Sequence, residues 1–267
     1  MKDTQATMDK QRNFWNSRVK SHNHTGWADY LKYAFDQPAR LKAIGEVLER
    51  AGACREKALD YGCGNGDFSR MLAGRFKDVV AYDISDEVIR IAKEKQGAEG
   101  NILFTADANS MDLAIPDSTL DLVLSVTVLG HILDDADMGE ILSSFQRKLA
   151  PGGILIALEY SLPEKKEDCD YQRFSTFEEW KALFAGAGFS LERYYGFYHP
   201  VKRPVGSYLR YKFNPEKIFW SFFQSIPFAR RRIGRIAENL VAKYHDFYWD
   251  GVRNDWMRIM VFRNQKP

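Results

Sequence analysis

A glycine-rich segment over residues 60–66, Asp-Tyr-Gly-Cys-Gly-Asn-Gly, holds the residues best suited to chemistry in this chain. The apolar residues that end at Leu59 predict a buried strand before it, and the residues from Phe68 onward predict a helix after it. Gly62 and Gly64 permit a tight turn whose bare backbone a ligand can approach, and the start of the helix offers unpaired N–H groups. The segment therefore predicts a binding site for a nucleotide-like ligand.

The spacing of the glycines and the acid before them restrict the kind of ligand. Gly62, Gly64 and Gly66 stand at alternate positions, whereas dinucleotide-binding folds carry the pattern G-x-G-x-x-G. A carboxylate at Asp60 would repel a pyrophosphate, but it would attract a cation such as the ammonium of an amino-acid moiety. The segment therefore favours a cationic ligand over a dinucleotide.

Further along the chain, four segments read as short apolar strands with an acid or a turn at one end. They cover residues 79–85, 102–108, 120–132 and 149–157. The first of them ends in Asp83 and Ile84, and a carboxylate at the end of a second strand can accept hydrogen bonds from both hydroxyls of a ribose. Together with the glycine-rich segment, these strands predict an alternating strand–helix chain and a parallel sheet.

In this order and spacing, the segments resemble the motifs of the Rossmann-like (class I) S-adenosylmethionine-dependent methyltransferases of the small-molecule type. The resemblance covers about residues 57–160. It implies an α/β fold: a seven-stranded, mostly parallel sheet with helices on both faces and an antiparallel last strand. It also implies S-adenosylmethionine (SAM) as the cofactor, with Asp83 on the ribose and Asp107 against the adenine amino group. The cofactor-binding residues that it implies are Asp60, Gly62, Gly64, Asp83, Ile84, Asp107, Ala108 and Ser125.

Methyl transfer to a hydroxyl needs an aligned acceptor and benefits from a positioned base. His131 lies just beyond the fourth predicted strand, on the side of the sheet where such sites form, and Glu159 follows the fifth. Both are therefore candidate catalytic residues. The alternatives are that His131 anchors its loop and that Glu159 fixes the acceptor or forms an ion pair.

The chain divides into four predicted parts, of which the first and third lie outside the common core. These are an N-terminal helical lid over residues 1–55, a SAM-binding core over 56–198, a basic, aromatic helical cap over 199–252, and the last core strand with a tail over 253–267. Residues 199–250 carry ten Lys or Arg against four Asp or Glu, a net charge of +6, although the whole chain has only +2. A basic amphipathic helix can lie on an anionic membrane or cap the sheet, and we favour the structural cap.

Composition sets the remaining expectations. The three cysteines show no C-x-x-C spacing, so neither a disulfide framework nor a metal site is expected. Without a secretory leader or an apolar run of about 20 residues, we expect a cytoplasmic protein, peripheral to a membrane if the cap binds one. Nucleic-acid binding is not expected, because the basic patch has no recognised module beside it. The sequence sets no oligomeric state.

The sequence therefore favours a SAM-dependent methyltransferase that acts on the oxygen of a small-molecule acceptor. A saccharide, a phosphate-bearing compound or a lipid-linked compound would suit the basic cap. A non-catalytic Rossmann-like binding protein and a nicotinamide-dependent oxidoreductase are the alternatives. The intact acids at Asp60, Asp83 and Asp107 argue against the first, and the glycine spacing argues against the second.

Overall fold

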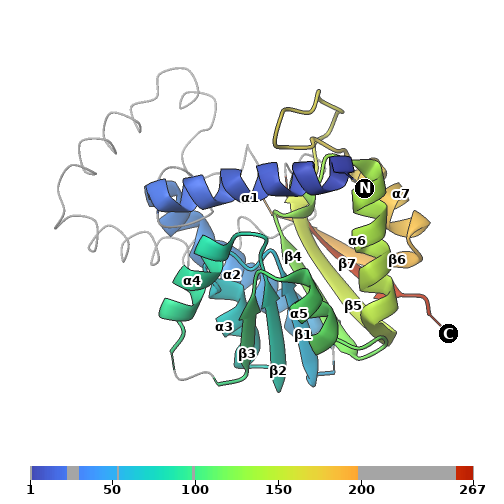
Figure 1. Ribbon diagram of the computed structural model, residues 1–267. Coiled ribbons are helices and arrows are strands. Elements are labelled where there is room, and N and C mark those ends of the chain that lie inside the picture. The colour runs from blue at the N-terminus through green and yellow to red at the C-terminus, as the bar shows by residue number, and fades with distance from the viewer. Residues whose placement is uncertain (1, 23–29, 53, 98–99, 198–256, 267) are drawn as a thin grey trace.

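The computed structural model describes residues 2–22, 30–52, 54–97, 100–197 and 257–266, which form a seven-stranded sheet flanked by helices (Figure 1). The strands are β1 (Lys57–Tyr61), β2 (Asp78–Tyr82), β3 (Ile102–Thr105), β4 (Leu120–Val126), β5 (Leu149–Tyr160), β6 (Phe189–Gly196) and β7 (Met257–Asn264). Their order in the sheet is β3-β2-β1-β4-β5-β7-β6. β1 to β5 pair in parallel, and β7 runs antiparallel to both β5 and β6. The predicted α/β fold with an antiparallel last strand is confirmed.

Helices cover both faces of this sheet. They are α1 (Lys2–His22), α2 (Tyr30–Ala51), α3 (Asp67–Ala73), α4 (Asp86–Glu94), α5 (Ala108–Ala114), the 3₁₀ turn η1 (Leu129–His131), α6 (Asp135–Lys148) and α7 (Phe177–Gly186). Successive strand residues point to opposite faces, so Leu122 and Leu124 pack with α2, α3 and α4, while Val123 packs with α5, α6 and α7. These two hydrophobic cores, one on each face of the sheet, hold the strands in place.

Side chains cap the N-terminal ends of α4 and α7. The hydroxyl of Ser85 accepts the N–H of Val88 at 3.2 Å and starts α4. Thr176 and Glu179 form a reciprocal capping box at the start of α7. Such a cap is worth about 1 kcal/mol, because it satisfies an N–H group that the first helical turn leaves without a partner.

Helix α1 lies across the sheet at the end where β2 and β4 finish (Figure 1). The side chain of Arg12 donates to the carbonyl oxygen of Ile84 at 3.0 Å, just beyond β2. Gln11 donates to the carbonyl oxygen of His131 at 2.9 Å, just beyond β4. This one helix therefore bridges the loops that follow two different strands.

The predicted basic cap, residues 199–252, lies outside the described residues, as do residues 253–256 of the predicted last segment. Within the ranges that the structure describes, no helix is both long and apolar enough to cross a bilayer.

Candidate active site

A cavity of about 540 Å³ lies at the carboxyl ends of β1, β2 and β4, under α1. Its floor is the turn between β1 and α3, which we call the glycine turn (residues 62–66), together with Asp83 and Ile84 after β2. A second part of its wall is the His131 turn (residues 127–131) after β4. Phe14 and Trp15 of α1 also line it. The cavity thus joins both parts of the predicted site.

Gly62 is required at its position in the glycine turn for two reasons. Its φ of 77° lies in the left-handed region, which favours glycine. A Cβ atom at Gly62 would also lie 2.1 Å from a methyl group of Val128, far closer than two carbon atoms can approach. The absence of a side chain therefore lets the turn after β1 pack directly against the turn after β4.

Asp83 lies at the end of β2 with its carboxylate turned toward the glycine turn. One oxygen accepts the N–H of Gly64 and the other accepts the N–H of Ser85, each at 3.0 Å. Burial raises the pKa of Asp83 to about 6, although both hydrogen bonds act to lower it. Because Asp83 lines the cavity, its carboxylate stands where the sequence predicts a contact with ribose hydroxyls.

Asp60 lies deeper than predicted. Its side chain is only 1% exposed, accepts the hydroxyl of Ser69 at 2.6 Å and does not line the cavity. Burial, and next to it the nearby charge of Asp83, raise the pKa of Asp60 to about 7. A cationic ligand bound near the glycine turn would favour the ionised forms of both buried carboxylates and would lower their pKa values.

Four of the predicted cofactor residues lie outside the cavity lining: Asp60, described above, and Asp107, Ala108 and Ser125. Asp107 caps α5: its carboxylate accepts the N–H of Ser110 at 3.0 Å and the Ser110 hydroxyl at 2.6 Å, and these bonds lower its pKa. Ala108 is the exposed first residue of that helix, and Ser125 is fully buried inside β4. The capping requirement of α5 thus occupies the carboxylate expected against adenine.

His131 lines the cavity in a defined orientation. Its Nδ1 lies 2.6 Å from the carbonyl oxygen of Tyr171, and since a carbonyl only accepts, Nδ1 carries the proton. In the neutral ring, Nε2 is then the nitrogen with a free lone pair. Burial lowers the pKa of His131, against the contrary effect of the Tyr171 carbonyl, and the charge of Arg18 lowers it further. The imidazole is therefore neutral near pH 7 and able to accept a proton.

Glu159, which the sequence predicts as a catalytic residue, lies outside the cavity lining. Its carboxylate accepts the backbone N–H groups of Val128 at 2.9 Å, Leu129 at 2.8 Å and Gly130 at 3.2 Å. The side chain is 1% exposed and does not line the cavity. With both oxygens bound to the backbone, Glu159 is not placed to take a proton from an acceptor.

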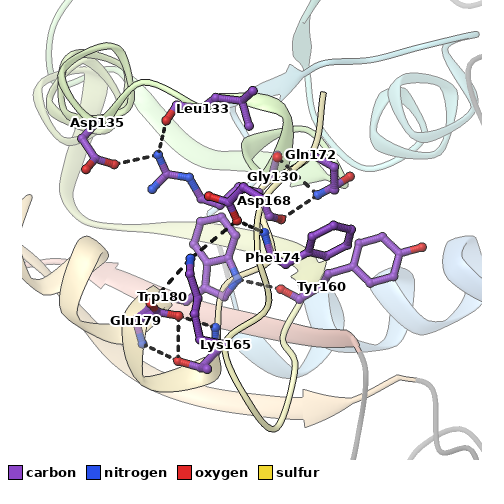
Figure 2. A network of polar contacts seen from close by, with 12 residues as sticks. Gly130, Leu133, Asp135, Tyr160, Lys165, Asp168, Gln172, Phe174, Glu179 and Trp180 are labelled. Atoms are coloured by element: carbon purple, nitrogen blue, oxygen red, sulfur yellow. Dashed lines mark hydrogen bonds and ion pairs between the residues drawn. The ribbon is translucent and has the colours of Figure 1, made fainter. Parts of the chain in front are cut away.

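One wall of the cavity, the β5–α7 loop (residues 161–176), was not predicted from the sequence. Tyr171, Gln172 and Phe174 of this loop line the cavity, and the ring of Tyr171 stacks on Phe14 of α1 with centroids 5.6 Å apart. Figure 2 shows the loop crossing beside Gly130, with Lys165 of the loop paired to Glu179 of α7. The ring N–H of Trp180 in α7 donates to the carbonyl oxygen of Tyr160, at the end of β5. No local pattern marks these residues, because their role depends on a meeting of distant segments.

Two guanidinium groups also line the cavity and were not predicted. Arg18 comes from α1 and Arg40 from α2, where Arg40 is only 7% exposed. Arg18 lies 6.0 Å from the centre of the Trp15 ring. The cavity therefore has the Asp83 carboxylate beside the glycine turn and the guanidinium groups of Arg18 and Arg40 on its helical wall.

Comparison with known proteins matches residues 59–157 to a family described as a methyltransferase domain. The chain is 37% identical over 130 residues to the ubiquinone/menaquinone biosynthesis C-methyltransferase of Marinomonas sp. (strain MWYL1), covering 46% of this chain and 49% of that protein. It is 30% identical over 126 residues to the malonyl-[acyl-carrier protein] O-methyltransferase of Serratia marcescens, covering 46% and 47%. The alignments thus span about half the length of these curated relatives.

Among solved structures, a putative sarcosine dimethylglycine methyltransferase from Galdieria sulphuraria superposes with a TM-score of 0.56. The two chains are 17% identical, and the match covers 84% of this chain and 85% of the other. At this identity the likeness concerns the fold. The family match, by contrast, spans the glycine turn, Asp83 and His131, so the matched segment carries the cavity residues from both parts of the site.

Proposed function

We propose that this chain, whose core is a Rossmann-like (class I) SAM-dependent methyltransferase domain, transfers a methyl group from SAM to a hydroxyl-bearing small molecule. The observation that carries the proposal is a single cavity that joins the glycine turn and Asp83 to His131, a neutral histidine of fixed tautomer. The first set of groups suits the cofactor and the second suits an acceptor. Their shared cavity lets the two reactants meet.

The groups beneath the glycine turn fit SAM, which carries an ammonium and a sulfonium cation. Burial raises the pKa values of the Asp60 and Asp83 carboxylates, and a bound cation would stabilise their ionised forms. Asp83 would hold the ribose, and the turn at Gly62 would lie against the methionine end. When bound there, SAM supplies an electrophilic methyl group on sulfur.

The residues of this chain then have to align the acceptor and remove its proton. The hydrogen bond from Nδ1 of His131 to the Tyr171 carbonyl fixes the ring and leaves Nε2 as the base. A positioned general base contributes about 10²–10⁴-fold to such a reaction. The aromatic rings of Phe14, Trp15 and Tyr171 line the same cavity and favour an acceptor with a flat apolar face.

Methylation at oxygen is the first candidate, because a base beside a hydroxyl produces an oxygen nucleophile directly. Methylation at carbon is the second, and the 37% identity to a C-methyltransferase favours it. The two need the same first step on a phenol-like acceptor, since a phenolate carries negative charge on its oxygen and on ring carbons. Saccharide, phosphate-bearing and lipid-linked acceptors that carry a hydroxyl stay within the proposal.

Transfer of tritiated methyl groups from SAM to fractionated cell extract tests this function. We expect label in a small-molecule fraction with wild-type protein and little with His131→Gln. Partition of the labelled product between aqueous and lipid phases identifies the acceptor class. Hydriodic acid cleaves methyl ethers and leaves C-methyl groups, so it distinguishes O-methylation from C-methylation. Equal labelling by the wild-type and His131→Gln proteins, or none by either, would contradict the proposal.

A further inference from the structure

We propose that Glu159 is a positioning residue: by capping the backbone of the His131 turn, it sets the place from which His131 presents Nε2 to the cavity. The inference rests on the proposed role of His131. It assigns Glu159 no contact with substrate, because its side chain lies outside the cavity lining. The relevant contacts are the hydrogen bonds of the backbone N–H groups in the turn.

The His131 turn cannot satisfy its own N–H groups. Its helical part, η1, has three residues, so the N–H groups of Val128, Leu129 and Gly130 precede any intrahelical acceptor. The only side chain at the N-terminal boundary of η1 is that of Val128, which provides no cap. The carboxylate of Glu159 accepts all three N–H groups from the neighbouring strand, as the N-cap that the local sequence lacks.

Sheet register brings Glu159 to this position. Leu158 of β5 pairs with Val126 of β4, and its carbonyl accepts the N–H of Thr127 at 2.7 Å. Glu159 is the next residue of β5, so it stands directly beside the point where the chain leaves β4. Thr127, the first residue of the turn, is thus bound to Leu158, and the cap of the turn is the next residue of the same strand, Glu159.

The turn needs such a cap because its backbone is strained at the first residue. Thr127 has a φ of 56°, in the left-handed region that a β-branched side chain rarely adopts. A conformation of this kind persists only where its surroundings hold it, and it is typical of functional sites. Three hydrogen bonds to one buried carboxylate, immediately after Thr127, provide that restraint.

The opposite side of the turn is held by the β5–α7 loop, as Figure 2 shows at Gly130. The carbonyl of Gly130 accepts the N–H of Arg173 at 2.6 Å and the side-chain amide of Gln172 at 3.2 Å. A Cβ atom at Gly130 would lie 2.4 Å from that amide and 3.1 Å from Glu159. The turn is therefore enclosed between Glu159 and Gln172, with no space for another position.

The Tyr171 hydrogen bond and the Glu159 cap orient different parts of His131. Tyr171, from the loop, fixes which nitrogen carries the proton through its hydrogen bond to Nδ1. Glu159 fixes the backbone on which the ring stands. If the backbone shifts, the Tyr171 carbonyl and Nδ1 separate, and the tautomer is no longer defined. Loss of Glu159 should therefore change the ring of His131 without changing the residues that bind the cofactor.

Glu159→Gln tests this, because it keeps the shape of the side chain but replaces one accepting oxygen by an NH₂ group that faces backbone N–H groups. With ¹⁵N-labelled protein bound to S-adenosylhomocysteine, we expect the imidazole signals of the Nδ1-protonated tautomer in the wild type and a tautomer mixture in the variant. With a short-chain quinol as acceptor, kcat should fall by about 10–100-fold. The affinity for S-adenosylhomocysteine should change by less than about twofold.

Asp121→Asn is the matched control. Asp121 also accepts two backbone N–H groups, those of Glu56 at 2.9 Å and Lys57 at 3.0 Å, but at the start of β4, the opposite end of the strand from the cavity. Both variants should lower the melting temperature, and only Glu159→Gln should change the His131 signals. If Glu159→Gln does not fold, Glu159→Asp keeps the charge and should give a smaller shift toward the mixed tautomer.

The proposal is overturned if Glu159→Gln, or Glu159→Asp in its place, lowers the melting temperature as Asp121→Asn does while the His131 signals stay those of the wild type. Glu159 would then serve stability alone. Should the wild type transfer no methyl group to any acceptor, the proposed function fails, and the NMR comparison still decides the role of Glu159. The two failures are therefore distinguishable.

Discussion

The cofactor side and the acceptor side of the cavity are built in different ways. On the cofactor side, the hydrogen bonds of the two buried carboxylates join residues close in sequence: Asp83 with Gly64, 19 positions apart, and Asp60 with Ser69, 9 positions apart. On the acceptor side, His131 bonds Tyr171 at a separation of 40 and Gln11 at a separation of 120. Backbone and strand ends make the first side, whereas distant segments assemble the second.

This difference teaches how one fold can keep its cofactor and change its acceptor. The glycine turn is fixed by steric limits at Gly62 and cannot vary without moving Val128. Phe14 and Tyr171 meet only through the packing of α1 on the β5–α7 loop, so their replacement leaves the sheet intact. Substitutions on the two sides should therefore have separable effects, and the following predictions use that separation.

The largest effect is expected at His131, on the acceptor side. His131→Gln should lower the rate of methyl transfer by about 10²–10⁴-fold, because the base is lost. The affinity for S-adenosylhomocysteine, measured by isothermal titration, should stay near the wild-type value. A variant that transfers methyl groups at the wild-type rate would show that proximity alone suffices, and a variant that loses cofactor binding would break the separation of the two sides.

The next effect concerns the pH dependence of stability on the cofactor side. The pKa of Asp60 is raised from 3.8 to about 7 by burial, so the folded chain binds this proton more tightly than the unfolded chain. The stabilisation is complete below about pH 4 and is lost as the pH rises through about 7. Asp60→Asn cannot titrate at this position. As the pH rises through about 7, the free energy of unfolding of the wild type should therefore fall by up to a few kcal/mol relative to that of Asp60→Asn, at about 1.4 kcal/mol per pKa unit.

Urea unfolding of the wild type and Asp60→Asn at about pH 5 and about pH 8 measures this difference. A difference between the two proteins that does not change with pH would mean that Asp60 is ionised throughout. The same titration predicts that SAM binds more tightly as the pH rises through about 7, because the ionised carboxylate attracts its cations.

A smaller effect is expected from the carboxylate at the end of β2. Asp83→Asn should weaken S-adenosylhomocysteine binding by roughly 10–100-fold, since hydrogen bonds to a charged group are worth about 1.5–3 kcal/mol. Asp107→Asn is the matched control, because that carboxylate caps α5 outside the cavity lining. Equal weakening by the two variants would restore the predicted adenine contact of Asp107.

Much of the fold was predictable, because its signals are local. Apolar runs marked the strands that end at the glycine turn and at Asp83. The α/β class followed from the alternation of strand and helix signals, and the antiparallel last strand from the resemblance to the methyltransferase family. These features depend on neighbours in the sequence, so the sequence contains them.

The site was predictable only where a strand end fixes it. Gly62 and Asp83 line the cavity, but Ser125 does not, because alternation along β4 places Leu124 and Val126 in the core beside α2, α3 and α4 and turns Ser125 to the other face. Tyr171 depends on the long β5–α7 loop, which carries no motif. Glu159 was found from its place at the end of the fifth predicted strand, yet its role depends on the neighbouring turn.

The remaining prediction concerns the basic segment outside the described residues, for which we retain a proposal from sequence. If residues 199–252 contact an anionic membrane, neutralising Arg230, Arg231 and Arg232 should reduce co-sedimentation with anionic vesicles, at about 1 kcal/mol per residue. Binding should also weaken with salt. SAM affinity should not change. A wild type that binds no vesicles at low salt would leave the structural cap as the interpretation.

The central claim is that this cavity binds SAM rather than a dinucleotide, and isothermal titration of the wild-type protein tests it most directly. Titrating S-adenosylhomocysteine should give saturable binding in the micromolar range, and NADH should give none, because the alternate glycines and the buried Asp60 and Asp83 disfavour a pyrophosphate. Micromolar binding of NADH, with no binding of S-adenosylhomocysteine or SAM, would contradict the account.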